Sequence, residues 1–257
     1  MNTDHCFVVM AFGDSPFLAG CLDGLKAQTV QTRIVIATST PSPYIADIAM
    51  RYGIEIVINP LKAGIGSDWN FGLTLTDARY VTLAHQDDAY YPKFAERTLS
   101  LFEKSPDAAV CFTAYREIDN EGKETSSKLS VVKHILEAVS VGRKERVGGA
   151  RVRSILAFGN ALPCSSVTFN RARLPNFRFS LDYKSNLDWD AWWVLQEQGE
   201  IFLHAPDRLI GRRHNPMTET SRLIREGIRQ KEDLIMFRRM WPSPIADVLA
   251  YLFRASY

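Results

Sequence analysis

Residues 80–88 read YVTLAHQDD, in which a short β-rich run, Tyr80–Ala84, passes directly into a pair of aspartates. Apolar runs of the same kind precede it at Cys6–Phe12, Arg33–Ala37 and Ile54–Ile58. Between these runs the apolar residues recur at helical spacing. We therefore predict a β-α-β-α-β-α-β order, which is typical of a mostly parallel sheet with helices on both faces.

Polar segments follow three of the predicted strands, at Gly13–Ser15, Thr38–Ser42 and His85–Asp88. In sheets of this class, ligands bind outside the carboxyl ends of the strands. We therefore expect the three segments to gather on one rim and to contribute to a ligand site there.

The second half of the chain alternates less regularly. We predict a strand at Ala108–Tyr115, a helix at Leu187–Gln198 capped by Ser185-Asn186, and a strand at Ile201–His204. The segment Lys123–Val152 is polar and rich in glycine and lysine, with one helical patch. We expect either a mobile lid or a plain surface excursion there.

The composition is that of an ordinary globular protein, with 46% apolar and 23% charged residues among 257, and we expect one domain. A net charge of +2 is too small to favour nucleic acid as a partner. Four scattered cysteines without a C-x-x-C pair are expected to be reduced and buried, as in a cytoplasmic protein. We expect no leader peptide and no membrane span, since no apolar stretch approaches about 20 residues.

The pair Asp87-Asp88 is the sharpest local feature, because adjacent carboxylates after a buried strand repel each other without a cation. Hard divalent metals prefer oxygen ligands and commonly bridge carboxylates to phosphate oxygens. The alternative is a solvated turn. The position of the pair on the predicted rim favours the metal site.

The predicted helix after Asn186 places Asp188 on the apolar side, where it shares a face with Trp192 and Leu195. A carboxylate in the first helical turn is held ionised by the helix dipole, which suits a general base. The alternative is an ordinary helix-start charge at Asp188 or Asp190. We expect the neighbouring tryptophans to belong to the core.

Arg212, Arg213 and His214 follow the last predicted strand. Arginine matches phosphate oxygens with its fork of donors, and histidine can bind a metal or a diphosphate. The alternative is a surface loop, and the functional interpretation depends on the preceding Asp188 segment.

Taken together, these segments resemble the inverting glycosyltransferases of family 2, which have the GT-A fold. The resemblance runs in order along most of the chain and rests on Val8–Thr29 (VVMAFGDSPFLAGCLDGLKAQT), Asn59–Gly72 (NPLKAGIGSDWNFG), Ala84–Pro92 (AHQDDAYYP), Asp119–Gly122 (DNEG), Asn160–Ser166 (NALPCSS), Asp188–Leu195 (DWDAWWVL) and Arg212–His214 (RRH). It implies an α/β fold of GT-A type, with a nucleotide-sugar-binding half at 1–115, an acceptor half at 116–221 and a helical tail at 222–257.

The resemblance also implies an activity: transfer of a sugar from a nucleotide-diphosphate sugar to an acceptor hydroxyl, with inversion, in surface glycan or polysaccharide synthesis. By position, Asp88 and His214 would bind Mn²⁺ or Mg²⁺, and Asp188 would deprotonate the acceptor. A UDP-sugar is the favoured donor, and the acceptor would be a glycan or a lipid-linked sugar. The implied donor contacts are Ala11, Phe12, Thr38, Ser39, Asp68, Asn70, Asp87 and Arg212.

Three positions depart from the family pattern. Thr38 and Ser39 stand where the family usually has acids that grip the nucleobase or ribose, so the choice of uridine stays open. Gln86 replaces the first acid of the metal motif, which leaves less negative charge for the metal. Leu187 replaces a glutamate that often precedes the base, so Asp190 remains an alternative to Asp188.

Two other functions also fit parts of the pattern. A metal-dependent nucleotidyltransferase would use paired carboxylates, but the first loop, AFGDSPF, has no Lys or Arg before Lys26 to hold a triphosphate. A catalytically silent sugar-nucleotide-binding relative would account for the acids missing at Thr38 and Gln86.

We predict that Arg222–Met240 forms one basic amphipathic helix, followed by an apolar stretch at Ile245–Phe253. Such a pattern can lie on the inner face of an anionic membrane. Because Glu226, Glu232 and Asp233 interrupt the basic face, we favour a tail that packs on the domain or on a second subunit of a homodimer.

Overall fold

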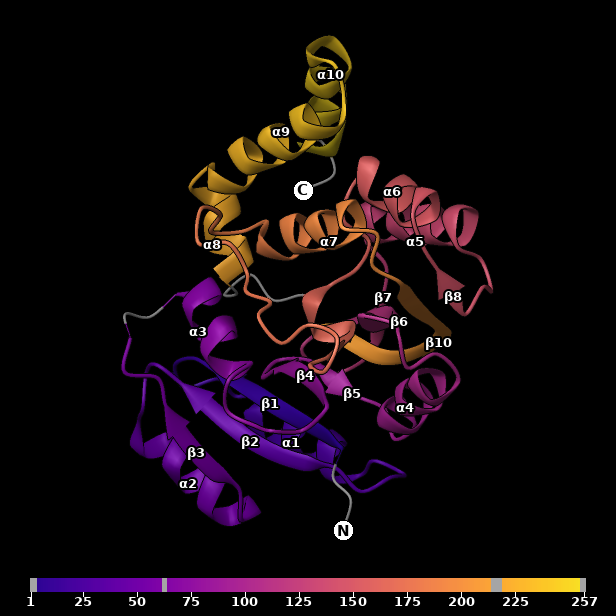
Figure 1. Ribbon diagram of the computed structural model, residues 1–257. Helices are drawn as coiled ribbons and strands as arrows, with labels where there is room; N and C mark the ends of the chain where they lie inside the picture. Colours follow the sequence, from indigo (N-terminus) through magenta and orange to yellow (C-terminus); the bar gives the residue numbers. More distant parts are fainter. Residues whose placement is uncertain (1–3, 62–63, 214–218, 255–257) are drawn as a thin grey trace.

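The computed structural model describes residues 4–61, 64–213 and 219–254, in which a mixed sheet carries helices on both faces (Figure 1). The first half confirms the predicted alternation. Its elements are β1 (His5–Ala11), α1 (Leu18–Lys26), β2 (Arg33–Thr38), α2 (Pro43–Tyr52), β3 (Glu55–Ile58), α3 (Ile65–Gly72) and β4 (Tyr80–His85).

The second half is more helical than the sequence patterns predict. Its elements are β5 (Ala89–Tyr90), α4 (Phe94–Lys104), β6 (Val110–Ile118), β7 (Glu124–Thr125), α5 (Lys128–Ser140), β8 (Arg146–Val147), α6 (Ala150–Ala157), the 3-10 turn η1 (Cys164–Ser166), β9 (Val167–Asn170), α7 (Leu187–Glu197), β10 (Phe202–Arg213), α8 (Glu219–Arg225), α9 (Ile228–Met240) and α10 (Ser243–Arg254).

The helical patch expected within Lys123–Val152 is confirmed as α5, and the segment also contains the start of α6 and buries Val141 and Val152. Two predictions for this half are wrong in detail. The strand expected to stop at His204 continues to Arg213 as β10. It can do so because its register against β6 shifts in the region around Pro206, so that pairing resumes beyond the proline. The single helix expected over the tail is broken at Gly227, whose φ of 71° ends the helical path.

The strand order is β3-β2-β1-β4-β9-β6-β10-β5, with β7 and β8 paired at the side. The pairs β1–β2, β1–β4, β2–β3 and β6–β10 are parallel, whereas β9 runs antiparallel to both β4 and β6. In register, Ala11 lies opposite Thr38, and Met10 lies opposite His85. The carboxyl ends of β1, β2 and β4 therefore share one rim, as predicted.

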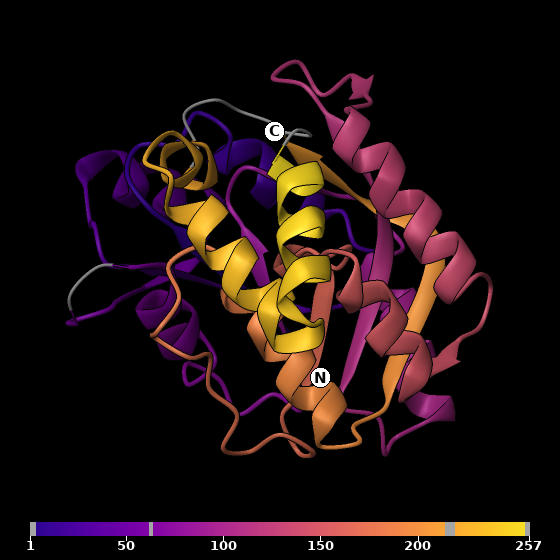
Figure 2. The ribbon, with the colours of Figure 1, turned by 90° about the horizontal axis from the view of Figure 1, so that it is seen from above.

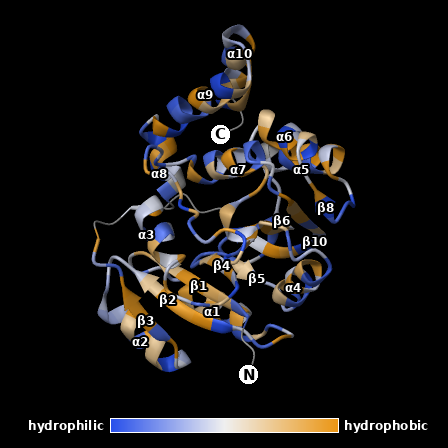
Figure 3. Ribbon diagram, viewed as in Figure 1, coloured by the Kyte–Doolittle hydropathy of each residue, from blue (hydrophilic) through white to orange (hydrophobic). Residues whose placement is uncertain are grey.

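The first strand shows how the two faces of the sheet are filled. Cys6 and Val8 belong to a cluster that includes residues of α3, α6 and α7, whereas Phe7 and Val9 belong to one formed with α1, α2 and α4. Alternation along the strand sends successive side chains to opposite faces. The apolar colouring of β1 and β2 follows from this double burial (Figure 3).

The C-terminal helices lie over α7, and the tail packs on its own domain (Figure 2). The rings of Phe237 and Phe253 lie 5.1 and 6.0 Å from that of Trp189. Part of the tail thus packs on the domain, as expected, whereas Ile245, Val248, Tyr251 and Leu252 of α10 remain 46–74% exposed. In the described ranges, none of the helices combines the length and apolar character needed to span a bilayer.

Gly24 of α1 is required by a close approach to β5. A β-carbon at this position would lie 2.5 Å from the main-chain oxygen of Tyr90, whereas one at Gly20 of the same helix would meet nothing within 4 Å. We expect Gly24→Ala to lower the free energy of unfolding by about 1–3 kcal/mol, because main chain cannot yield as a side chain can. Urea unfolding measures this change.

The matched control is Gly20→Ala, which should be neutral or raise stability by up to about 1 kcal/mol through helix propensity. Equal effects of the two substitutions would contradict the close packing of α1 on β5.

Candidate functional site

Three side chains that could hold a metal ion lie together at the end of β4. His85, Asp87 and Asp88 each offer one ligand atom, and these atoms lie within 4.8 Å of one another. The Nε2 atom of His85 is buried and has no hydrogen-bond partner in the described part of the chain. Two carboxylates and an unpartnered imidazole suit a divalent cation, so these residues fit the predicted metal.

Asp88 lies in surroundings that disfavour its charge unless a cation is present. It is 4% exposed, and its Oδ1 accepts a hydrogen bond from the main-chain N–H of Arg213 at 2.9 Å. Burial raises the pKa of Asp88 to about 6, and repulsion from Asp87 adds to this, while His85 and the Arg213 N–H act in the opposite direction. A bound divalent cation would favour the ionised form.

Arg213 joins three loops at the rim. Its Nε donates to the main-chain oxygen of Asp87 at 2.9 Å, and its guanidinium also donates to the main-chain oxygen of Asp119. The guanidinium carbon lies 4.3 Å from the ring centroid of Phe17, in cation–π contact. The side chain therefore fixes the loop that carries the two aspartates.

Gln86 has a role that the acid of the family pattern could not perform. Its Nε2 donates to the main-chain oxygen of Phe12 at 2.7 Å, and its Oε1 accepts from the Phe12 N–H at 3.2 Å. An ionised carboxylate accepts hydrogen bonds but cannot donate them. The amide thus ties the loop after β1 to the loop after β4, next to the buried Ala11.

The predicted donor contacts on the loops after β2 and β3 meet at Asp68. Its carboxylate accepts from Ser39 Oγ at 2.9 Å and from Asn59 Nδ2 at 2.8 Å. Thr38 is buried at the end of β2, and its Oγ1 accepts from the N–H of Thr40 at 3.0 Å. The structure therefore brings Thr38, Ser39 and Asp68 into one part of the rim.

Asn70 is engaged elsewhere. Its Nδ2 donates to the main-chain oxygen of Phe179 at 2.9 Å, and its Oδ1 accepts from the Phe179 N–H at 2.7 Å. Both ends of the amide are thus bonded to main chain, which fixes α3 to the segment that precedes α7.

The two aspartates of α7 have different surroundings. Asp190 is 6% exposed and pairs with Arg239 of α9 at 2.6 Å, so its charge already has a partner. Asp188 is half-buried, and its Oδ1 accepts from the N–H of Trp189 at 2.8 Å. In the described ranges no cation forms an ion pair with Asp188.

The start of α7 differs from the predicted cap. The side chain of Asn186 makes no cap hydrogen bond and instead donates to Asp233 at 2.8 Å. The buried carboxylate of Glu232 accepts from three consecutive main-chain N–H groups, at 2.8–2.9 Å. The tail therefore positions the segment that carries Asp188.

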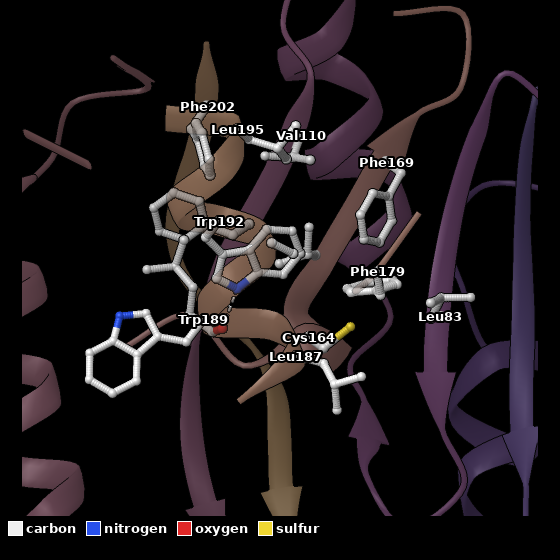
Figure 4. Packing of buried hydrophobic residues seen from close by; sticks show 14 of the residues in the cluster. Leu83, Val110, Cys164, Phe169, Phe179, Leu187, Trp189, Trp192, Leu195 and Phe202 are labelled. Atoms are coloured by element: carbon white, nitrogen blue, oxygen red, sulfur yellow. Dashed lines mark hydrogen bonds between the residues drawn. The ribbon is translucent and has the colours of Figure 1, made fainter. Parts of the chain in front are cut away.

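The tryptophans of α7 belong to the core, as predicted. Trp189, Trp192 and Trp193 are at most 3% exposed. The indole of Trp192 lies 5.7 Å from the ring of Phe169, and its N–H donates to Leu162 (Figure 4). These rings hold α7 in place and leave no exposed face for a sugar.

Arg212 lies at the end of β10, with its Nη1 atom 3.9 Å from Glu117 Oε1 and about a third of the side chain exposed (33%). His214, the other predicted metal ligand, lies outside the described residues. His85 and Gln86 were expected on the rim and Arg213 in the phosphate-binding segment, but none of the three was predicted as a metal ligand or as a brace of the metal loop. His85 lies directly before the acid pair, but a sequence does not show where a histidine side chain points.

Comparisons with known proteins show the family and the fold of the chain. The family model described as glycosyl transferase family 2 matches residues 6–165. The amylovoran biosynthesis glycosyltransferase AmsE of Erwinia amylovora is 30% identical over 118 residues, which cover 44% of each chain. An uncharacterised glycosyltransferase of Rickettsia bellii is 24% identical over 121 residues, which cover 45% of this chain and 18% of the relative. The matched part thus spans less than half of either relative.

The solved structures show the same fold. TarS residues 1–349 from S. aureus superpose with a TM-score of 0.64 at 10% identity, covering 97% of this chain and 70% of that one. The mannosyltransferase PcManGT from Pyrobaculum calidifontis superposes with a TM-score of 0.66 at 12% identity, covering 98% and 74%. The fold is therefore the GT-A fold of these neighbours. Since the family model matches more than half of the 257 residues, the chain belongs to glycosyl transferase family 2.

Proposed function

We propose that the protein transfers a sugar from a nucleotide-diphosphate sugar to an acceptor hydroxyl, with inversion at the anomeric carbon. The observation that carries this proposal is the cluster of His85, Asp87 and Asp88 on the ligand rim. Two neighbours support it through what they bind: TarS has been solved with UDP-GlcNAc, and PcManGT with GDP-Man and Mn²⁺. The relative named for amylovoran biosynthesis supports a role in surface glycan or polysaccharide synthesis.

Asp87 and Asp88, with His85, would hold Mn²⁺ or Mg²⁺, and we propose His214 as a further ligand. The ion would act as a Lewis acid that stabilises the departing diphosphate. Arg212 would add a cation for the phosphate oxygens. The remaining donor contacts would come from Ala11, Phe12, Thr38, Ser39 and Asp68, whereas the amide of Asn70, also predicted, is bonded to Phe179.

Asp188 is the general base that we propose. It would accept the proton of the acceptor hydroxyl as that oxygen forms its bond to the anomeric carbon. The bond between this carbon and the diphosphate oxygen breaks on the opposite face, which gives inversion. Burial raises the pKa of Asp190 and Arg239 lowers it, but the ion pair at 2.6 Å occupies its carboxylate, which supports the choice of Asp188.

Hydrolysis of the donor tests the proposal without knowledge of the acceptor. With Mn²⁺ and a panel of sugar nucleotides, UDP-sugars first, we expect slow release of the nucleoside diphosphate. Release of pyrophosphate would indicate a nucleotidyltransferase instead. Binding of a sugar nucleotide with no turnover would indicate a silent relative.

We propose a cytoplasmic protein whose tail serves the fold and not a membrane. All four cysteines are free and buried, as predicted. Four tail arginines form ion pairs within the protein: Arg222 with Glu219 and Glu226, Arg229 with Asp233, Arg238 with Asp247, and Arg239 with Asp190 and Glu197. Cations that are paired in this way attract an anionic lipid surface less strongly.

We therefore expect little flotation of the protein with anionic vesicles at physiological salt. The charge reversal Asp247→Lys, which releases Arg238 and adds a cation, is the matched control and should increase flotation. Strong, salt-sensitive flotation of the parent protein would contradict a tail devoted to packing.

A further inference from the structure

Gln86 stands where the family pattern has an acid, and its amide is committed to another contact. Both ends of the amide bond to the main chain of Phe12, at 2.7 and 3.2 Å, and Gln86 does not belong to the metal cluster. In the described ranges, the third group of that cluster is the imidazole of His85, whose ligand atom lies within 4.8 Å of those of Asp87 and Asp88. The ligand set is therefore two carboxylates and one ring nitrogen.

The ring of His85 is stacked on an indole. Its centroid lies 5.5 Å from that of Trp69, with an interplanar angle of 27°. Its Nε2 is buried and has no hydrogen-bond partner among the described residues, which leaves this nitrogen available to a cation. The ring of a metal-binding histidine has to be oriented by its surroundings. The stack supplies such a contact, because it sets the plane of the imidazole.

Trp69 is itself fixed in α3. It is 7% exposed, and the ring of Phe179 packs against it at 4.9 Å in an edge-to-face arrangement. The next residue, Asn70, bonds through both ends of its amide to the main chain of Phe179, at 2.9 and 2.7 Å. An indole anchored in this way cannot move away from His85 without losing contacts on its other side. A cation bound to the imidazole would strengthen the stack, since positive charge is attracted to the face of an indole.

The ligand set bears on which ion binds. Mg²⁺ is bound through oxygen ligands and keeps several waters, whereas imidazole nitrogen is a ligand of first-row transition metals. Carboxylates suit both Mg²⁺ and Mn²⁺, so Asp87 and Asp88 alone would discriminate weakly between them. The nitrogen of His85 is the group that can separate the two ions.

We propose that Trp69 is a positioning residue of the metal site: it holds the His85 nitrogen in place of the missing acid and thereby makes the site select Mn²⁺ over Mg²⁺. This inference rests on the proposed function, in which a divalent ion serves the donor diphosphate, and it names the ion and the residues that choose it. His85 would contact the ion, whereas Trp69 would act through His85.

Competition between the two ions tests the preference without a nucleotide. The electron paramagnetic resonance signal of free Mn²⁺ falls as the ion binds, and Mg²⁺ is then added until half of the bound Mn²⁺ is released. We expect the parent to require about a tenfold excess of Mg²⁺ or more, and His85→Gln, which offers an oxygen in place of the nitrogen, to lower this excess about tenfold or more. His134→Gln, at a half-buried histidine of α5, is the matched control and should leave the excess unchanged.

The same competition tests Trp69. We expect Trp69→Leu to lower Mn²⁺ affinity by about tenfold, within the range contributed by groups that orient metal ligands, and Trp69→Phe, which keeps a ring against His85, to retain most of the affinity. If Trp69 acts through His85, Trp69→Leu has no further effect on Mn²⁺ affinity in a His85→Gln protein. The control is Trp241→Leu, which removes an indole that packs on Phe158 at 5.2 Å. A thermal unfolding curve verifies that each variant is folded.

Electron spin echo modulation of bound Mn²⁺ detects a directly bound nitrogen. The measurement uses a His214→Gln protein, because His214 is the other histidine proposed as a ligand. We expect nitrogen coupling in this protein and its loss when His85→Gln is added. A coupling that is absent before or persists after that addition would overturn the proposal. So would an equal Mg²⁺ excess in parent and His85→Gln, or an effect of Trp69→Leu that is undiminished in the His85→Gln protein.

These outcomes are separate from the donor-hydrolysis test. A protein that selects Mn²⁺ through His85 but releases no diphosphate from any sugar nucleotide would reject the proposed transferase and retain the metal preference. Diphosphate release by a protein whose Mg²⁺ excess is the same in parent and His85→Gln would do the reverse.

Discussion

Asp88→Asn should lower the affinity for UDP in the presence of Mn²⁺ by about 100-fold or more, since even the groups that orient metal ligands contribute about 10–100-fold. The amide oxygen of asparagine can still accept from the Arg213 N–H, so we expect the loop to keep its conformation. Isothermal titration of UDP with and without Mn²⁺ measures the effect.

Asp14→Asn is the control, because Asp14 follows β1 on the same rim but bonds to Ser42 at 2.6 Å and is not in the cluster. Since the pKa of Asp88 is raised to about 6, a proton competes with the cation as the pH falls through 6. The Mn²⁺-dependent affinity of the parent should decrease there, and that of Asp88→Asn should not. An unchanged Mn²⁺-dependent affinity in the variant would reject Asp88 as a ligand.

Asp188→Asn should reduce the rate of sugar transfer by about 10²–10⁴-fold, the usual contribution of a general base. Donor affinity should stay within about twofold of the parent, because the proton is taken from the acceptor. The measurements are kcat with an accepted sugar acceptor and the dissociation constant for UDP with Mn²⁺. A matching loss of donor affinity would make Asp188 a donor-site or structural residue.

Asp190→Asn is the matched control on the same helical turn. Its main effect should be to break the pair with Arg239, so transfer should fall by less than about tenfold. If Asp190→Asn has the larger rate defect, the roles of the two aspartates are exchanged.

The first half of the fold was predictable because its strands are buried on both faces and its helices have regular apolar spacing. The apolar residues after the first strand recur at helical spacing, and the four of them on α1, Leu18, Cys21, Leu22 and Leu25, are all buried. The position of the ligand rim could be predicted because the carboxyl ends of parallel strands lie at the same edge of a sheet. The pairing of Ala11 with Thr38 at the ends of β1 and β2 confirms it.

The helix α5 could not be predicted in the same way. Its apolar residues point outward and Lys133 points inward, so the usual link between apolar pattern and burial fails there. The sequence indicated a helical patch but not which side faces the protein.

The connections of the site were also beyond prediction, because they join residues far apart in the chain. Gln86 bonds to a main-chain group 74 residues away, and Arg213 bonds to one 126 residues away. In the sequence, Gln86 is visible only as an amide where the family pattern has an acid, and Arg213 only as one of two adjacent arginines. Only the folded chain shows that they brace the metal loop.

The position of β9 has a consequence for the growing polypeptide. The first four strands are contiguous in the chain, but the free edge of β4 pairs with Thr168–Asn170, and a buried row of polar side chains, His5 to Thr82 to Thr168, closes only then. A nascent chain that ends before residue 167 therefore carries an open edge at β4, and the Thr82 hydroxyl has only His5 as a partner. Open edges of this kind promote aggregation, so a chain truncated before β9 should be more prone to aggregate than the full chain.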